Sequence, residues 1–408
     1  MVEGKSLLTS PNLIQTPVIQ VKIGDQEFGV YKKNDQGGDI YPNYVQSLSV
    51  TKINGQVNTY ELQLIYPITE YSDPNYFEKV FSKVSKSRKI EFTYGDACTP
   101  TYMYKKEEGI ITDVKSNFNL DSANITYTVS AVSRGALGLT GSESFPATQN
   151  QPSRVIETIL TNPYYGLQDL FKGMQNMSLV RQHNLIPHTD VSVSIEKMDN
   201  ISPLGYIEYL VSLMTSQSSS SNEKGVYIIS FNDDTTGIFG GSYFKITEVS
   251  SKIEHSEAYQ VDLGYPGSNY VFRFEVENDE NYSIFYEYQN ELHPQEIVTR
   301  INADGDMEEV YAPRISSNNA QHTTRESDKS WWAKVTQYPV RASIQIKGLL
   351  RPAILMTYIR LNIILYGKRH INSGLYIITK QVDKIDGSGY QTTLNLLRIG
   401  SDWYFYLY

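Results

Sequence analysis

Alternating apolar and polar residues, broken by turn dipeptides, dominate both ends of the chain and restrict those parts to antiparallel β-sheet. The clearest stretch, from Val45 to Ile68, reads "VQSLSVTKINGQVNTYELQLIYPI". Its two period-two runs flank Asn54-Gly55, the preferred pair of a two-residue type I′ turn, in which both central residues need a positive φ. The stretch therefore predicts a tight hairpin.

The same pattern marks further strands along the chain. "TPVIQVKIGDQEFGVYKK" predicts a strand pair that turns near Gly24-Asp25, and "SGLYIITKQVDKIDGSGYQTTLNLLRIGS" predicts a hairpin with its turn from Asp386 to Gly389. Other runs that predict strands are "KIEFTYG", "PTYMYKKEEGIITDVKSNFNLDSANITYTVSAVSRG" (a hairpin), "GVYIISF", "SYFKITEV", "NYVFRFEVE", "SIFYEYQ" and "RASIQIKG". Because Gly387 and Gly389 lie between two strands, they are turn residues and not a phosphate cradle.

Three segments have helical patterns instead. In "SDPNYFEKVFSKVSKSRK", Asp73 can cap a helix that starts at Pro74 and carries one apolar stripe. The stripe consists of Phe77, Val80, Phe81 and Val84. "QPSRVIETILTNPYYGLQDLFKGMQ" predicts two short helices separated by Asn162-Pro163, and Ser202-Pro203 opens a further helix, "SPLGYIEYLVSLMTS".

The order of these patterns divides the chain, whose 408 residues predict two or three domains. We expect a first β-barrel domain at 1–145 with one inserted helix, and a helical α/β middle region at 146–240. A second β-barrel domain is expected at 241–408, with a polar loop excursion at about 302–331 and an aromatic tail. The fold class is therefore mainly β with an α+β insert.

The two β-rich ends contain an internal echo. Gly109 to Gly135 reads "GIITDVKSNFNLDSANITYTVSAVSRG", and Gly374 to Gly400 reads "GLYIITKQVDKIDGSGYQTTLNLLRIG". Both contain "IIT", then a valine, a polar turn, and a strand with Tyr and Thr that ends in Arg and Gly. Chance resemblance between two hairpins and a true duplication both remain open, and a duplication predicts two related barrels.

Charge and cysteine content exclude several classes of protein. The net charge is −9, and no dense Lys/Arg run is present, so a surface that binds nucleic acid tightly is not expected. An acidic chain can still line a passage for nucleic acid, because repulsion keeps the phosphate backbone from adhering. The single cysteine, Cys98, excludes an internal disulfide framework. No signal peptide is expected, since "MVEGKSLLTSPNLIQ" lacks a basic start followed by an apolar region. No membrane-spanning anchor is expected either, since Arg351, Pro352, Arg360 and Asn362 interrupt the most apolar stretch.

The search for a catalytic constellation is negative. The sequence has no phosphate-binding G-x-x-x-x-G-K-[ST] loop, no H-E-x-x-H and no G-x-S-x-G, so we expect no enzyme activity and no catalytic, cofactor or metal residues. The histidines occur singly, at His183, His188, His255, His293, His322 and His370. "NADGDMEEVY" has acidic residues but lacks the calcium-loop spacing, which favours a solvated turn.

The C-terminal block "RASIQIKGLLRPAILMTYIRLNIILYGKRHINSGLYIITKQVDKIDGSGYQTTLNLLRIG" resembles the closing segment of phage tail hub proteins, the family of the T4 baseplate hub and the late control proteins of contractile tails. The middle stretch "LGYIEYLVSLMTS", followed by a polar loop and "GVYIISFND", resembles the same family. The resemblance covers most of the chain in organisation, and about the last 60 residues in sequence.

The resemblance implies two tail-tube-like β-barrels per chain with an intervening α/β region, and a homotrimeric ring with six quasi-equivalent barrels. Such a ring joins a six-fold tail tube to a three-fold spike and lines the DNA channel. The implied partners are the tail tube protein, the central spike protein and baseplate wedge or other tail proteins, with DNA only in transit. The implied location is the virion tail or baseplate, after assembly in the host cytoplasm. No lysozyme or spike segment is matched.

The chain ends in "DWYFYLY", and tyrosine, which occurs 32 times, suits surfaces that meet another protein. We expect this tail to dock on a neighbouring chain or on the spike, or else to fold onto its own barrel. Its candidate interface residues are Trp403, Tyr404, Phe405, Tyr406 and Tyr408.

Two other functions stay open at this point. A receptor- or carbohydrate-binding tail module would use exposed aromatics such as Trp331 and Trp332 to grip glycan. A tail-associated hydrolase is the other, although no nucleophile or metal set is visible in the sequence.

Overall fold

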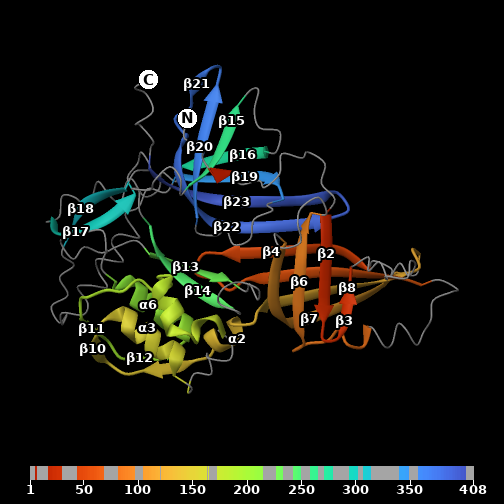
Figure 1. Ribbon diagram of the computed structural model, residues 1–408, viewed down its shortest axis with the longest axis horizontal. Helices are drawn as coiled ribbons and strands as arrows, with labels where there is room; N and C mark the ends of the chain where they lie inside the picture. Colours follow the sequence, from red (N-terminus) through yellow and green to blue (C-terminus); the bar gives the residue numbers. More distant parts are fainter. Residues whose placement is uncertain are drawn as a thin grey trace.

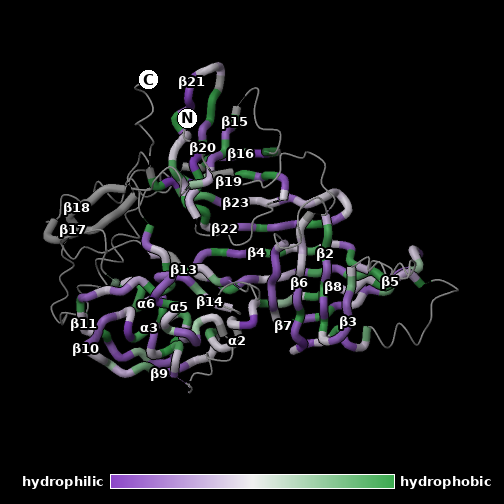
Figure 2. Tube along the Cα trace, in the orientation of Figure 1, coloured by the Kyte–Doolittle hydropathy of each residue, from purple (hydrophilic) through white to green (hydrophobic). Residues whose placement is uncertain are grey.

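The computed structural model describes residues 5–6, 17–29, 44–68, 81–96, 104–119, 121–162, 164, 172–214, 227–232, 242–249, 258–264, 271–278, 294–301, 307–313, 340–348 and 357–400. Its described strands form one large sheet and several two-stranded sheets, and a helical region lies beside the N-terminal part of the large sheet (Figure 1). The N-terminal and C-terminal parts of the large sheet are called the first and the second sheet below. Hydrophobic and hydrophilic residues alternate along the strands, so that one face of each of these two sheets is apolar (Figure 2).

The first sheet contains the strands of the N-terminal part, and neighbouring strands in it are all antiparallel. In spatial order its strands are β4 (Val45–Ile53), β5 (Thr59–Pro67), β8 (Asn124–Ser133), β7 (Lys105–Asn119), β6 (Lys89–Asp96), β2 (Pro17–Ile23) and β3 (Gln26–Phe28). Leu48, Leu62 and Phe92 are fully or almost fully buried between its strands. These alternating apolar residues form the first core.

The second sheet is built from the C-terminal part around a core of its own. Its strands in spatial order are β16 (Val271–Asn278), β19 (Val340–Lys347), β23 (Gly389–Gly400), β22 (Gly374–Asp386), β20 (Tyr358–Leu365), β15 (Tyr259–Gly264) and β1 (Lys5–Ser6), with β21 (Lys368–Arg369) against β20. Two pairings are parallel, β15 with β20 and β1 with β15, which the alternation pattern does not predict.

The two sheets share the long strand β22. Its first half, Gly374–Ile377, pairs with β20, and its second half, Lys380–Ile385, pairs with β4 of the first sheet. Figure 1 shows the hairpin of β22 and β23 between the two sheets. As a result, the two sheets are hydrogen-bonded into one continuous sheet of 15 strands.

The middle region packs around a third core. Its elements are α2 (Ala136–Leu139), β9 (Glu143–Phe145), β10 (Thr148–Asn150), α3 (Pro152–Thr161), η3 (Lys172–Met174), α5 (Met177–Gln182), β11 (Val193–Ile195), β12 (Met198–Ile201), α6 (Pro203–Ser212), β13 (Tyr227–Asn232) and β14 (Tyr243–Glu248). The Ser202 hydroxyl accepts a hydrogen bond from Gly205 N and caps α6 as predicted. Phe145 stacks on Tyr206 of this helix with ring centroids 3.9 Å apart.

The predicted fold class, mainly β with an α+β insert, is confirmed, and the two β units are antiparallel except for the pairings of β15 with β20 and β1. The first of the two helices predicted around Asn162-Pro163 is α3. Of the helix expected from Pro74, only its end is described, where Phe81 and Val84 enter the first core. The strand "SIFYEYQ" lies outside the described residues, and the boundaries 1–145, 146–240 and 241–408 stay predictions.

Two sequence predictions were wrong. The connection between β4 and β5 is five residues long, and Gly55 has a positive φ of +67° whereas Asn54 does not, so the turn is not type I′. The reason is tertiary, because Asn54 and Gly55 form hydrogen bonds with β22 and β13, and the bond that closes the turn runs from Gln56 N to Ile53 O. The excursion at 302–331 also contains a strand, β18 (Met307–Pro313), which pairs with β17 (Pro294–Ile301). The consecutive Glu308 and Glu309 hid its periodicity.

The echo seen in the sequence recurs in the strand order. The order β4-β5-β8-β7-β6 in the first sheet corresponds to β16-β19-β23-β22-β20 in the second, with every neighbouring pair antiparallel. Both sets follow the same order along the chain, which is the expected result of a duplicated unit. The β17–β18 hairpin lies in the second unit where the first has only the Asn54-Gly55 turn.

The two units also share a β-bulge at matching positions, although the pairing of β22 with β23 has a further register shift between Leu375 and Tyr376. A bulge interrupts β7 between Ile111 and Asp113, and a bulge interrupts β22 between Ile378 and Lys380. The bulged residue is a threonine each time, the last letter of "IIT". The Thr112 hydroxyl donates to Ser130 O at 3.1 Å, and the Thr379 hydroxyl donates to Asn395 O at 3.2 Å.

A second bulge recurs at an edge strand. The pairing of β4 with β5 shifts between Val45 and Ser47, and that of β16 with β19 shifts between Val271 and Arg273. When the two registers are aligned, residues of β4 correspond to residues of β16, and Leu48 corresponds to Phe274. Shared bulges at matching positions are not expected of two unrelated hairpins, so the structure favours duplication over chance.

We predict that Gly348→Ala destabilises the protein by about 1–3 kcal/mol, because over-packing a filled core forces its neighbours to move. A Cβ at Gly348 would lie 2.1 Å from Cγ of Tyr390, whose ring is buried between the sheets. Urea unfolding measures the change, and Gly387→Ala is the control, since nothing lies within 4 Å of a Cβ there. Equal midpoints for the two variants would contradict the prediction.

Candidate functional site

The most unusual chemistry among the described residues lies where β22 crosses from the second sheet to the first. Beyond the Thr379 bulge, Gln381, Asp383 and Ile385 alternate inward, and each is 1% exposed. Tyr390 and Thr392 follow on β23, so the tip of the C-terminal hairpin completes the N-terminal core. The sequence predicted this hairpin as part of the second barrel alone, and the structure makes it part of both units.

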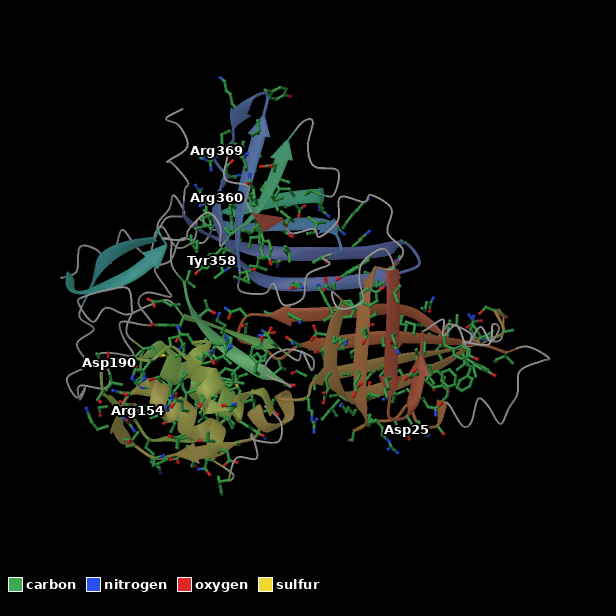
Figure 3. All side chains as sticks on the ribbon, in the orientation of Figure 1. Asp25, Arg154, Asp190, Tyr358, Arg360 and Arg369 are labelled. Carbon is green, nitrogen blue, oxygen red and sulfur yellow. The ribbon has the colours of Figure 1, made fainter. Side chains whose placement is uncertain are left out.

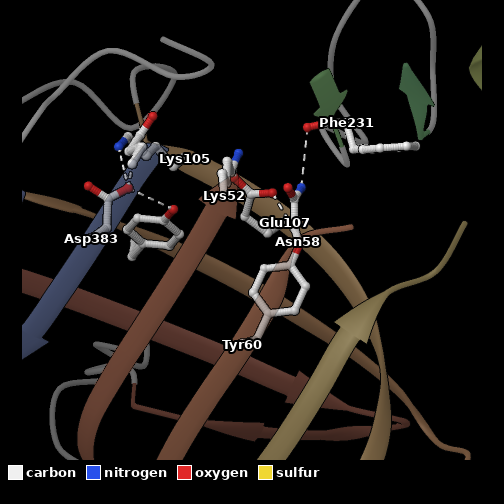
Figure 4. Close-up of polar contacts among 9 residues, drawn as sticks. Lys52, Asn58, Tyr60, Lys105, Glu107, Phe231 and Asp383 are labelled. Carbon is white, nitrogen blue, oxygen red and sulfur yellow. Dashed lines mark hydrogen bonds and ion pairs between the residues drawn. The ribbon is translucent and has the colours of Figure 1, made fainter. Parts of the chain in front are cut away.

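Asp383 is the centre of a buried polar network (Figure 4). Its Oδ2 atom lies 2.6 Å from Lys105 Nζ on β7 and accepts hydrogen bonds from Gln381 Nε2 at 2.8 Å and Tyr94 OH at 3.3 Å. Its Oδ1 atom accepts a hydrogen bond from the Thr392 hydroxyl at 2.6 Å. A buried carboxylate is tolerated when it is paired with a cation and its lone pairs are used, as they are here.

A second buried ion pair lies beside the first. Lys52 on β4 contacts Glu107 on β7, and both side chains are 4% exposed. Tyr60 donates a hydrogen bond to Glu107 Oε2 at 3.3 Å. The interior of the first unit therefore holds two lysines and two carboxylates, in pairs that connect β4, β7 and β22.

Burial changes the pKa values of several groups in this network. It lowers the pKa of Lys105, and the Asp383 carboxylate offsets part of that change. Burial also raises the pKa of Tyr94 and of Tyr390 well above the ordinary value, and the negative charge of Asp383 adds to the increase. The tyrosines therefore remain neutral donors at any physiological pH.

The Asn54-Gly55 turn links this junction to the middle region. Asn54 N donates to Thr379 O of β22 at 2.9 Å, and Gly55 N donates to Ile229 O of β13 at 2.9 Å. Ile229 N donates to the Asn54 side chain at 3.2 Å. On the other side, the Tyr358 hydroxyl of β20, labelled in Figure 3, donates to Glu248 O of β14 at 3.3 Å. Both sheets are thus fastened to the middle region.

The residues predicted as an interface are not part of this network. Trp403, Tyr404, Phe405, Tyr406 and Tyr408 lie outside the described residues, as do Trp331, Trp332 and Cys98. Within the described ranges, no group of three or more His, Cys, Asp or Glu side chains has the arrangement of a metal site. In the same part of the chain, no helix is long and apolar enough to cross a membrane.

Sequence reasoning missed the buried charges. Lys105 and Glu107 belong to "YKKEEG", and Asp383 belongs to "KQVDKID", which have the composition of solvent-exposed strand faces. The available signal is the alternation itself. In "KQVDKID", Asp383 lies two residues from Gln381 and from Ile385, so all three share the face that packs inward.

Comparison with known proteins identifies the fold. No family model matches the chain, and no curated protein is significantly similar to it in sequence. The 43 kDa tail protein of prophage MuSo2 from Shewanella oneidensis is similar in structure, with a TM-score of 0.53 and 13% identity over 94% of this chain and 98% of that chain. This chain has the fold of a phage tail protein. The resemblance inferred from the sequence is confirmed at the level of the fold.

Two further solved structures are similar at lower scores. A tail protein from Neisseria meningitidis MC58 has a TM-score of 0.49 and 9% identity, over 94% of this chain and 96% of that chain. A type VI secretion component from E. coli, described as similar to the T4 tail proteins gp27 and gp5, has a TM-score of 0.45 and 11% identity, over 93% of this chain and 78% of that chain. The fold assignment rests on the Shewanella protein.

We predict that Asp383→Asn lowers the free energy of unfolding by about 3–5 kcal/mol, because it leaves the buried Lys105 ammonium without its counter-charge. Adding Lys105→Met to this variant restores most of the loss, since no charge then remains unpaired. Urea unfolding of the single and double variants measures the coupling.

Arg181→Ala is the matched control for this cycle, because Arg181 pairs with Glu157 at the surface at 2.9 Å, where ion pairs contribute little. Additive losses in the Asp383 and Lys105 variants would contradict a coupled buried pair.

We predict that stability falls steeply above about pH 10. Burial raises the pKa of Tyr376 to about 12, and those of Tyr94 and Tyr390 are also raised, so between pH 10 and the folded-state pKa only the unfolded chain loses these protons. Each tyrosine then removes about 1.4 kcal/mol per pH unit. The lowered pKa of Lys105 acts in the opposite sense, but only up to its ordinary value of 10.5.

Denaturant midpoints measured from pH 9 to 11.5 test this prediction, and Tyr376→Phe reduces the decline. Tyr366→Phe, at a fully exposed position, is the control and keeps the decline of the wild type. A midpoint that does not change above pH 10 would show that these hydroxyls are not buried in the folded protein.

Proposed function

We propose that this chain is a structural protein of a phage-type tail: a hub whose three copies form a ring between the hexameric tail tube and the trimeric central spike. The observation that carries the proposal is the repeat of one strand order, with its register and bulges, twice in a chain with a tail-protein fold. Three such chains present six equivalent sheet units, which match a six-fold tube on one side and a three-fold spike on the other.

The charge of the chain suits the channel of such a ring. A net charge of −9 repels the phosphate backbone, so DNA passes without adhering to the wall. We assign the chain no catalytic role, because shape, charge and strand pairing are sufficient for a connector. Its partners in this proposal are the tail tube protein, the spike and the baseplate wedge or other tail proteins, and its location is the virion tail after assembly in the host cytoplasm.

The aromatic tail adds a contact between copies in this proposal. Residues 402–408 dock on a neighbouring chain or on the spike, with Trp403, Tyr404, Phe405, Tyr406 and Tyr408 as anchors. Aromatic side chains supply large contact area at low cost in conformational entropy, which suits a short terminal segment.

We predict that the purified full-length chain has the mass of a trimer in native mass spectrometry. Deletion of residues 402–408 weakens the trimer, so the deleted protein dissociates at higher protein concentrations than the full-length chain. Sedimentation velocity across a dilution series measures the difference. A full-length chain that stays monomeric at its highest attainable concentration contradicts the hub proposal, and an unchanged trimer after deletion contradicts only the role of the tail.

A further inference from the structure

The contact between the two units within one chain has a geometry that a contact between two copies of the chain can repeat. In the intrachain junction, Lys380–Ile385 of β22 pair antiparallel with Leu48–Ile53 of β4, and Ile385 lies opposite Leu48. Both residues are completely covered, with Ile385 1% and Leu48 0% exposed. The junction thus joins the second half of a long strand to the edge strand of the other unit.

The first unit contains the same long strand, and the structure describes no such partner for its second half. When the two "IIT" bulges are aligned, Asp113–Phe118 of β7 corresponds to Lys380–Ile385 of β22. Among the described strands, this half of β7 pairs only with β8, because β6 pairs with β7 no further than Ile110. Phe118, at the position of the buried Ile385, is 60% exposed. A long exposed edge with an apolar side chain is a site for pairing with another chain.

The second unit contains the matching edge strand. The register places Phe274 and Val276 of β16 at the positions of Leu48 and Val50 of β4. Leu48 and Val50 are 0% and 1% exposed, whereas Phe274 and Val276 are only partly buried against their core. Among the described strands, β16 pairs only with β19. Within the described part of the chain, no strand covers the other edge of β16 as β22 covers β4.

We propose that Asp113–Phe118 of one copy pairs antiparallel with β16 of a second copy, in the register of the intrachain junction. That register sets Phe118 opposite Phe274, Asn117 opposite Glu275 and Ser116 opposite Val276. Lys115 is set opposite Glu277 in the same register. This inference rests on the proposed trimer and names the surfaces that close it.

The geometry of this contact agrees with a closed ring. The two surfaces belong to different units of the chain, so the contact is head-to-tail, and such contacts form rings when the rotation closes. Three copies joined in this way have three intrachain and three interchain junctions of one kind. All six edges of the ring are then paired, which removes the aggregation risk of exposed strand edges.

The first test places a charge in the proposed contact. Phe118→Asp weakens trimer formation by about tenfold or more in sedimentation velocity, because the proposed contact covers this side chain against Phe274. Phe118→Leu preserves most of the association. Tyr366→Asp is the control, since Tyr366 is a fully exposed aromatic on another strand end, and it leaves the trimer unchanged. Thermal unfolding checks that the variants are folded, as expected for a side chain that is 60% exposed.

The second test reads the register directly. In a background in which Cys98 is replaced by serine, protein carrying Asn117→Cys is mixed with protein carrying Glu275→Cys and oxidised. The expected product is a disulfide-linked dimer of the two variants. Replacing Glu275→Cys with Ser343→Cys, one strand further from the edge, gives the control, in which no cross-link forms.

The outcomes separate this inference from the proposed function. A trimer that survives Phe118→Asp and yields no 117–275 cross-link overturns the inference and leaves the hub proposal standing. A wild-type chain that remains monomeric at every concentration, together with 117 and 275 cysteine variants that form no cross-link, overturns both. The register given above is supported if Phe118→Asp disrupts the trimer and Tyr366→Asp does not, and if the 117–275 cysteine pair cross-links and the 117–343 pair does not.

Discussion

The pairing of one strand, β22, with two different sheets is the constraint on which the rest of the structure depends. Backbone amides and carbonyls along a strand edge need partners, and β22 supplies them to β20 with its first half and to β4 with its second. Because of this split, the tip of the C-terminal hairpin completes the N-terminal core with Ile385 and Tyr390. The two ends of the sequence therefore contribute to one hydrogen-bonded sheet.

The buried pair of Lys105 and Asp383 determines the register of that split. A slip of β22 by one residue along β4 would turn its inward side chains outward, and Lys105 would lose its carboxylate partner inside the core. Leaving one partner of a buried ion pair uncompensated costs about 3–5 kcal/mol, so the correct register is strongly preferred over its neighbours. The ion pair thus adds specificity, even where an apolar pair would give equal stability.

The sequence predicts the strands better than their connections, for a physical reason. Period-two alternation reports local burial, so it located most of the strands of both sheets and the hairpin around Asp386. It does not report which distant strand lies alongside, and so it missed the parallel β15 and the division of β22 between two sheets. The Asn54-Gly55 turn shows the same limit, because contacts with β13 and β22 override its local preference. The buried charges were missed because strand composition does not distinguish a paired interior lysine from an exposed one.

The two kinds of junction in the proposed ring differ in a way that prevents wrong assembly. Asp383 belongs to the intrachain junction, and the register places Ser116 at the corresponding position of β7. If β7 of another copy displaced β22 from β4, Ser116 would replace the carboxylate and leave Lys105 buried without a counter-charge. In the reverse error, β22 would bring Asp383 to β16 of the second unit and away from Lys105. Both errors leave one buried charge unpaired, so first and second units are expected to alternate around the ring.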